Sequence, residues 1–241
     1  MSCERSNKVI LYLMRHGQTI MNKAERVQGW CDGVLTEEGI EVARDAAVGL
    51  RDIEFKAVYS SDLGRTIKTA RIVIKENRVN NKLKVKEVPD LREAYFGKYE
   101  GESEKIMARD MLRYLEVNSF EEAMKLPEFY KVYADTCAAL DETGNAEDFN
   151  TLIKRVNRGI LNICEDISSQ GGGNVLLVVH GGMLMTFLKN LDNNLNIKMI
   201  ENSSVSKVKY ENGELEVLSV NDLSYREKGH ELRKNNVIFM H

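Results

Sequence analysis

Short, uninterrupted apolar segments constrain the fold of this chain more than any other feature. Residues 175–179 read Val-Leu-Leu-Val-Val, and residues 9–14 read Val-Ile-Leu-Tyr-Leu-Met. Neither segment alternates polar with apolar side chains, so each predicts a strand that is buried on both faces. Strands of this kind occur in parallel sheets that helices cover on either side. We therefore expect an α/β fold.

Helical patterns separate these apolar segments. Thr36 has the side chain of a helix N-cap, and apolar residues recur at spacings of three and four through Leu50, which predicts one helix. A second helix is expected after the polar segment 60–62, and a long one from Phe149 until three glycines at 171–173 interrupt it. Alternation of helices with buried strands is typical of a mostly parallel sheet covered on both faces.

Shorter segments complete the expected sheet. Residues 57–59 predict a second strand, and residues 85–88 predict a weak third one. A two-strand hairpin at the sheet edge is expected near the end of the chain, with strands at 205–210 and 215–220 around an Asn-Gly turn. We expect residues 1–241 to form a single domain, because α/β domains of this length are common.

The composition excludes several classes of protein. The net charge is −3 and no basic region is present, so nucleic acid is not an expected partner. No apolar stretch approaches the length of a membrane span or of a signal-peptide core. We expect a reduced, cytoplasmic protein without a disulfide framework or a structural zinc site, because no Cys-x-x-Cys pair occurs among its four cysteines, Cys3, Cys31, Cys137 and Cys164.

The segment 100–147 differs in charge from the rest of the chain. It contains 12 acidic and 5 basic residues, a net charge of −7, whereas the remainder has a net charge of +4. It shows no strand pattern, so we expect a helical insertion that lies over the sheet within the same domain. Two interpretations are open: a solvated acidic helical hairpin, or a cap that shapes a substrate pocket.

Polar, chemically active residues follow three of the predicted strands. Arg15 and His16 follow the first strand, the segment 60–65 with Arg65 follows the second, and His180 follows the clearest strand. Glycines come directly after both histidines. Because ligands bind at the carboxyl ends of parallel strands, these side chains are expected to meet in one site.

Two histidines and two arginines make a poor metal site, because no carboxylate or thiolate joins them at ligand spacing. They make a good phosphate site. A guanidinium group is always charged and matches two phosphate oxygens at once. A neutral imidazole is a competent nucleophile near pH 7, since its unperturbed pKa is about 6.5. We expect neither a metal nor a cofactor.

These motifs resemble those of the histidine phosphatase superfamily, the phosphoglycerate-mutase-like group, in its phosphatase branch. The Arg-His-Gly motif lies in Leu-Met-Arg-His-Gly-Gln-Thr, and five blocks occur in the family's order: 13–19, 27–30 with 35–39, 59–66, 91–93 with 96–97 and 100–101, and 179–182. The resemblance implies a three-layer α/β/α fold with the helical insertion over the active site.

The resemblance also implies roles for the matched residues. His16 would be the nucleophile that is phosphorylated, and Arg15 and Arg65 would bind the phosphate oxygens. His180 would stabilise the transferring phosphoryl group, and Glu93 would donate a proton to the leaving oxygen. This assignment agrees with the needs of phosphoryl transfer, which are in-line positioning and electrostatic stabilisation by fixed cations.

Further residues are implied as phosphate donors. Gln18 and Asn22 would add neutral hydrogen bonds, and the backbone N–H of Gly181 would add another. The expected substrate is a small phosphorylated metabolite. His230 and His241 lie in a polar tail and have no expected role.

The second acceptor of the phosphoryl group separates three functions. In cofactor-dependent phosphoglycerate mutases we expect Phe-Thr-Gly-Trp in place of Val-Gln-Gly-Trp at 27–30, and Arg-His-Tyr-Gly in place of Ala-Tyr-Phe-Gly at 94–97. The missing cation and the acidic insertion favour hydrolysis, with the mutase as the alternative enzyme. A catalytically silent phospho-ligand-binding module is disfavoured because all five catalytic positions are present. The particular phosphomonoester and the oligomeric state, including a possible homodimer, stay open.

Overall fold

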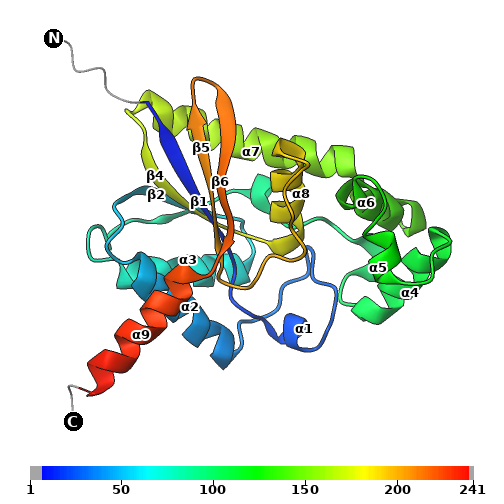
Figure 1. Ribbon diagram of the computed structural model, residues 1–241, viewed down its shortest axis with the longest axis horizontal. Coiled ribbons are helices and arrows are strands. Elements are labelled where there is room, and N and C mark those ends of the chain that lie inside the picture. Colours follow the sequence, from blue (N-terminus) through cyan, green and yellow to red (C-terminus); the bar gives the residue numbers. More distant parts are fainter. Residues whose placement is uncertain (1–6, 239–241) are drawn as a thin grey trace.

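A six-stranded sheet lies at the centre of the computed structural model, which describes residues 7–238 (Figure 1). The strand order is β3-β2-β4-β1-β5-β6. Strands β1 to β4 run parallel, and β5 pairs antiparallel with β1 and with β6 at one edge. The mostly parallel sheet and the edge hairpin are thereby confirmed. The strands are β1 (Val9–Arg15), β2 (Phe55–Ser60), β3 (Val85–Glu87), β4 (Gly173–Val179), β5 (Val205–Glu211) and β6 (Glu214–Asp222).

Helices cover both faces of the sheet, which gives the expected three layers. On β4, Val175, Leu177 and Val179 belong to one hydrophobic core, and Leu176 and Val178 belong to a second core on the opposite face. This division explains why the strand carries no polar alternation. The first core includes α7 (Phe149–Ser169) and α8 (Gly181–Leu191), and the second includes α2 (Glu37–Leu50) and α3 (Gly64–Glu76).

The expected helix boundaries have local causes. Thr36 Oγ1 accepts a hydrogen bond from Gly39 N at 2.9 Å and begins α2 as its N-cap. The long helix α7 ends at the glycine run because Gly171 and Gly172 have φ angles of +91° and +71°, a region that glycine adopts without steric cost. The chain then turns directly into β4.

The acidic segment is helical, as expected. It contains α4 (Glu104–Tyr114), α5 (Phe120–Ala123) and α6 (Phe129–Leu140), which lie together at one end of the molecule (Figure 1). Met107, Met111 and Tyr130 join the same hydrophobic core as α7. Short helical turns precede the segment at η1 (Pro89–Leu91) and η2 (Gly97–Tyr99), and α1 (Ile20–Lys23) follows β1.

The polar tail after the hairpin is a helix rather than an irregular segment. Helix α9 (Ser224–Ile238) packs on α2 so closely that a Cβ atom on Gly229 would lie 1.7 Å from the carbonyl oxygen of Asp45. Asp45 also accepts from His230 Nδ1 at 3.0 Å and from Arg233 Nη1 at 2.5 Å. The sequence pattern misses this helix because its contacts are made by glycine and by charged side chains. Cys3 and His241 lie outside the described residues.

The part of the chain that the structure describes contains no helix long and apolar enough to cross a membrane.

Candidate active site

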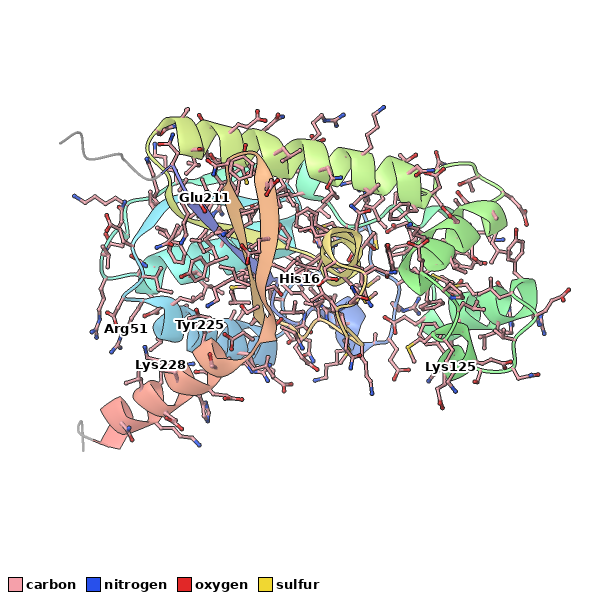
Figure 2. The ribbon with its side chains drawn as sticks, turned by 45° about the horizontal axis from the view of Figure 1, so that its top comes forward. His16, Arg51, Lys125, Glu211, Tyr225 and Lys228 are labelled. Atoms are coloured by element: carbon pink, nitrogen blue, oxygen red, sulfur yellow. The ribbon has the colours of Figure 1, made fainter. Side chains whose placement is uncertain are left out.

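The carboxyl ends of β1, β2 and β4 meet, and they bring the predicted residues together. His16 N donates to Val179 O at 3.0 Å, so the residues that follow β1 and β4 lie side by side. The imidazole rings of His16 and His180 have their centroids 5.2 Å apart, at an interplanar angle of 63°. Both side chains are buried, and His16 is labelled near the centre of Figure 2. The geometry agrees with the predicted meeting of the two histidines.

The hydrogen bond of His16 determines which of its nitrogen atoms carries a free lone pair. Nδ1 lies 2.8 Å from the carbonyl oxygen of Gly17, which can only accept, so Nδ1 carries the proton. Nε2 therefore keeps its lone pair in the neutral ring. Burial, together with the positive charges of Arg65 and Arg15, holds the pKa of His16 well below its usual value. The imidazole of His16 is thus neutral at neutral pH, as the predicted nucleophile has to be.

His180 is fixed from the end of β2. Its Nε2 lies 2.7 Å from Ser61 Oγ, which in turn lies 2.8 Å from Thr66 Oγ1. Burial, then the charge of Arg65, holds the pKa of His180 well below its usual value. His180 is also the N-cap residue of α8, so its ring lies at the positive end of that helix.

The two arginines are anchored by backbone carbonyl groups. Arg65, in the first turn of α3, donates from Nη1 to Cys31 O at 2.9 Å and from Nη2 to Gly29 O at 2.6 Å. Its Nη1 also lies 3.0 Å from Asp32 Oδ1. Arg15 donates from Nη1 to Ile200 O at 2.6 Å. Burial lowers the pKa of both guanidinium groups, because it deprives each charge of the solvation that water would supply.

Three buried nitrogen atoms of these residues have no hydrogen-bond partner within residues 7–238. They are Arg15 Nε, Arg65 Nε and His180 Nδ1. Buried polar groups without partners are rare in folded proteins, because each one loses its hydration. Ser203 Oγ, whose residue donates its N–H to Arg15 O at 3.0 Å, is buried without a partner as well. Arg15, Arg65 and His180 all lie close to His16, so hydrogen-bonding capacity is left unused beside it, as a phosphate-binding site requires.

Glu93 lies against the N-terminus of α8. Its carboxylate accepts from Gly182 N at 2.8 Å, from Met183 N at 2.6 Å and from Ala94 N at 2.9 Å. Burial raises the pKa of Glu93, while these N–H groups oppose the increase. A carboxyl group with a raised pKa retains its proton to higher pH, as a general acid must.

The predicted neutral donors are partly engaged by the protein. Gln18 Oε1 accepts from Thr36 Oγ1 at 3.0 Å, and Asn22 Oδ1 accepts from Thr19 N at 3.2 Å in the capping box of α1. Only their amide N–H groups can therefore bind phosphate. Gly181 is the first residue of α8, and a Cβ atom there would lie 3.0 Å from Arg15 Nε, so a side chain would crowd the site. The phosphate-binding roles of these residues stay predictions.

Several supporting residues escaped the sequence analysis. Ser61 orients His180, and Asp32 pairs with Arg65. Asn202 Nδ2 donates to the carbonyl oxygen of His16 at 2.9 Å. The Glu100 carboxylate accepts from the N–H groups of Gly29, Trp30, Cys31 and Phe96, and so fixes the loop whose carbonyl groups hold Arg65. Such residues give no periodic signal, because they act on the backbone of distant segments.

Between residues 7 and 238, no group of three or more His, Cys, Asp or Glu side chains is arranged to hold a metal ion. Metal-independent catalysis stays a prediction that activity measurements can test.

Comparison with known proteins identifies the family. The model of the histidine phosphatase superfamily (branch 1) matches residues 11–223. The metal-independent phosphoserine phosphatase of Arabidopsis thaliana is 30% identical over 216 residues, which are 89% of this chain and 82% of that protein. A crystal structure of phosphoglycerate mutase from Bacillus anthracis str. Sterne has a TM-score of 0.90 and 42% identity, covering 94% of this chain and 98% of that one. Bacillus stearothermophilus YhfR gives a TM-score of 0.73 at 26% identity, covering 90% and 99%.

This chain belongs to the histidine phosphatase superfamily. The matches confirm the expected family and fold, and they support the expected enzyme class, a phosphoric monoester hydrolase of the histidine phosphatase type. Relatives named as a phosphoglycerate mutase or a probable phosphoglycerate mutase fit the alternative.

Proposed function

We propose that this enzyme hydrolyses a small phosphomonoester through a phosphorylated His16. The observation that carries the proposal is the set of buried, unpartnered atoms Arg15 Nε, Arg65 Nε and His180 Nδ1, found among the described residues around a neutral imidazole. Fixed donors of this kind stabilise the charge of a transferring phosphoryl group without reorganisation.

The reaction then has two balanced steps. In the first, His16 Nε2 attacks phosphorus, the bond to the ester oxygen breaks, and the protonated Glu93 gives its proton to that oxygen as the alcohol departs. In the second, the Glu93 carboxylate takes a proton from a water molecule, and the resulting hydroxyl oxygen attacks phosphorus. The phosphorus–nitrogen bond breaks, and inorganic phosphate leaves a neutral His16. Arg15, Arg65 and His180 bind the phosphoryl oxygens throughout.

The pairing of the nearby cations favours water over a second phosphorylated molecule as the acceptor. Arg92 is hydrogen-bonded to Asp62 through two nitrogen atoms and lies over the Trp30 ring, at 4.5 Å from its centroid. Tyr95, in the segment where the mutase pattern has a cation, stacks on Trp30 with the ring centroids 4.8 Å apart. A bisphosphorylated ligand would need cations beyond Arg15 and Arg65, and Arg92 is already neutralised.

A labelling experiment tests this function. Rapid quench with an isotopically labelled phosphomonoester should trap label that survives alkali and is lost in acid, as a phosphoramidate is. His16→Ala should abolish labelling, and full labelling of that variant would refute the assignment. A phosphate-release screen over sugar phosphates, nucleotides, phosphoglycerates and cofactor precursors, run beside a mutase assay, distinguishes hydrolysis from transfer.

Three further expectations belong to the same proposal. A cytoplasmic location is supported by the cysteines that the structure describes, since Cys31, Cys137 and Cys164 are free thiols. Nucleic acid is not a proposed partner, on the grounds of net charge.

A homodimer is compatible with an exposed edge strand such as β6, and light scattering of the purified protein tests it.

A further inference from the structure

The side chain of Arg155, in helix α7, is hydrogen-bonded to the backbone on and before Glu93. Its Nη1 donates to the carbonyl oxygens of Asp90 and Arg92, at 3.0 Å each, and its Nη2 donates to that of Glu93 at 3.1 Å. The Glu147 carboxylate accepts from Nε at 2.8 Å and from Nη2 at 2.5 Å. All five N–H donors of the guanidinium group are therefore used.

Glu147 is hydrogen-bonded to the backbone that follows Glu93. Its Oε2 accepts from Tyr95 N at 3.1 Å, and its own N–H donates to Tyr95 O at 2.9 Å. Trp30 Nε1 adds a hydrogen bond to Glu93 O at 2.9 Å. The backbone before and after Glu93 is thus bound to α7 and its leading residues, while the carboxylate is bound to the N-terminus of α8.

The Arg155–Glu147 pair is buried, with side-chain exposures of 12% and 9%. A buried ion pair loses much of its hydration, so it adds little to stability. What the Arg155–Glu147 pair does provide is a fixed geometry of the backbone that it binds. Arg158, one turn further along α7, gives a contrast. Its side chain is 59% exposed and binds only the carboxylate of Asp90, at 2.8 and 2.6 Å.

We propose that Arg155 and Glu147 form a positioning pair for proton donation, which holds Glu93 where it can reach the leaving oxygen. This inference rests on the proposed function, in which Glu93 is the general acid. Neither residue touches the substrate; both act through the backbone of residues 90–95. Lysine cannot replace Arg155, because a single ammonium group cannot bind three carbonyl oxygens and both oxygens of a carboxylate.

The test uses the dependence of the rate on the leaving group. Single-turnover phosphorylation of His16 is measured with an alkyl phosphate, whose leaving oxygen needs a proton, and with p-nitrophenyl phosphate, which needs little help. Arg155→Lys should slow the alkyl reaction about 10²-fold, the scale of a small misplacement of a reacting group. The p-nitrophenyl reaction should stay close to wild type. The matched control, Arg158→Lys, should leave both rates unchanged.

A double variant makes the test specific for Glu93. If Arg155 acts only by placing that carboxyl group, Arg155→Lys should slow the alkyl reaction of the Glu93→Gln variant no further. Equal slowing of both substrates by Arg155→Lys, or a further full loss in the double variant, would show that Arg155 merely stabilises the fold and would overturn the proposal.

Folding is monitored by the thermal midpoint of each variant. If Arg155→Lys does not fold, Glu147→Gln is measured in the same way, since it keeps the shape and one acceptor oxygen; a folded Glu147→Gln with an unchanged ratio of the two rates overturns the inference. The wild-type labelling arm separates the two proposals. Absence of labelled His16 in the wild type refutes the proposed function. If the wild type is labelled but variants of Arg155 and Glu147 leave the ratio of the two rates unchanged, only the positioning role is refuted.

Discussion

Lowering the pH should destabilise this protein through its two active-site histidines. The pKa of His16 and the pKa of His180 are both held well below the ordinary value, chiefly by burial. Below pH 6.5 the unfolded chain therefore binds a proton at each site that the folded protein does not bind. Above the unfolded pKa both states are neutral at these positions and stability does not depend on them. As the pH falls below it, the free energy of unfolding decreases progressively, because only the unfolded chain takes up the protons.

The size of this effect follows from proton linkage. At pH 5.5, one unit below the unfolded pKa, each histidine that stays neutral in the folded state lowers the free energy of unfolding by roughly 1 kcal/mol relative to pH 8. The two together lower it by roughly 2 to 3 kcal/mol. The raised pKa of Glu93 acts in the opposite direction, because a proton bound by the folded state stabilises it at low pH and is lost as the pH rises.

Urea denaturation at pH 8 and pH 5.5, followed by circular dichroism at constant ionic strength, measures the difference. His16→Asn and His180→Asn each remove one titrating group, so each variant should lose roughly 1 kcal/mol less than wild type between the two pH values. Glu93 is common to all three proteins and cancels. The buffer must be free of phosphate, which would stabilise the folded state by binding. An identical pH dependence in all three proteins would refute the reasoning.

Three further predictions concern catalysis. Arg15→Lys should lower kcat/KM by about 10²-fold, because the planar fork and the unpartnered Nε are lost while the charge is kept; activity close to wild type would make Arg15 structural. Glu93→Gln should slow phosphorylation of His16 by an alkyl phosphate roughly 10²–10⁴-fold and by p-nitrophenyl phosphate far less; equal slowing of both would remove Glu93 as the acid. Excess chelator should leave the rate of phosphate release unchanged; inactivation that magnesium or zinc reverses would contradict the mechanism.

The parts of this structure that the sequence predicts are those with a periodic or local signal. Continuous apolar residues predict the buried strands at 9–14 and 175–179. The carboxyl ends of these strands place His16 and His180 together. Helix α9 was not predicted, because it meets α2 through Gly229 and ion pairs rather than through an apolar stripe.

The contacts that support the site could not be predicted from the sequence either. Glu100 begins the acidic segment 100–147, for which a solvated hairpin was one open interpretation, and Arg155 lies on the predicted helix from Phe149. Each nevertheless binds several backbone groups of loops distant in sequence. Hydrogen bonds of a side chain to distant backbone depend on tertiary geometry and leave no spacing to read. The family motif predicts that Glu93 is the acid, but only the structure shows which contacts fix its position.

The position of β1 between β4 and β5 has a consequence for biosynthesis. Strand β1 is made first, yet both of its neighbours lie more than 160 residues further along the chain, beginning at Gly173 and Val205. At 5–20 residues per second, the apolar first strand waits roughly ten to thirty seconds on the ribosome before β4 exists. Contacts of such long sequence separation fold slowly and leave strand edges exposed meanwhile. A nascent chain halted before residue 173 is therefore expected to need a chaperone and to show no phosphatase activity, because the proposed nucleophile at the end of β1 has no neighbouring strand to pair with.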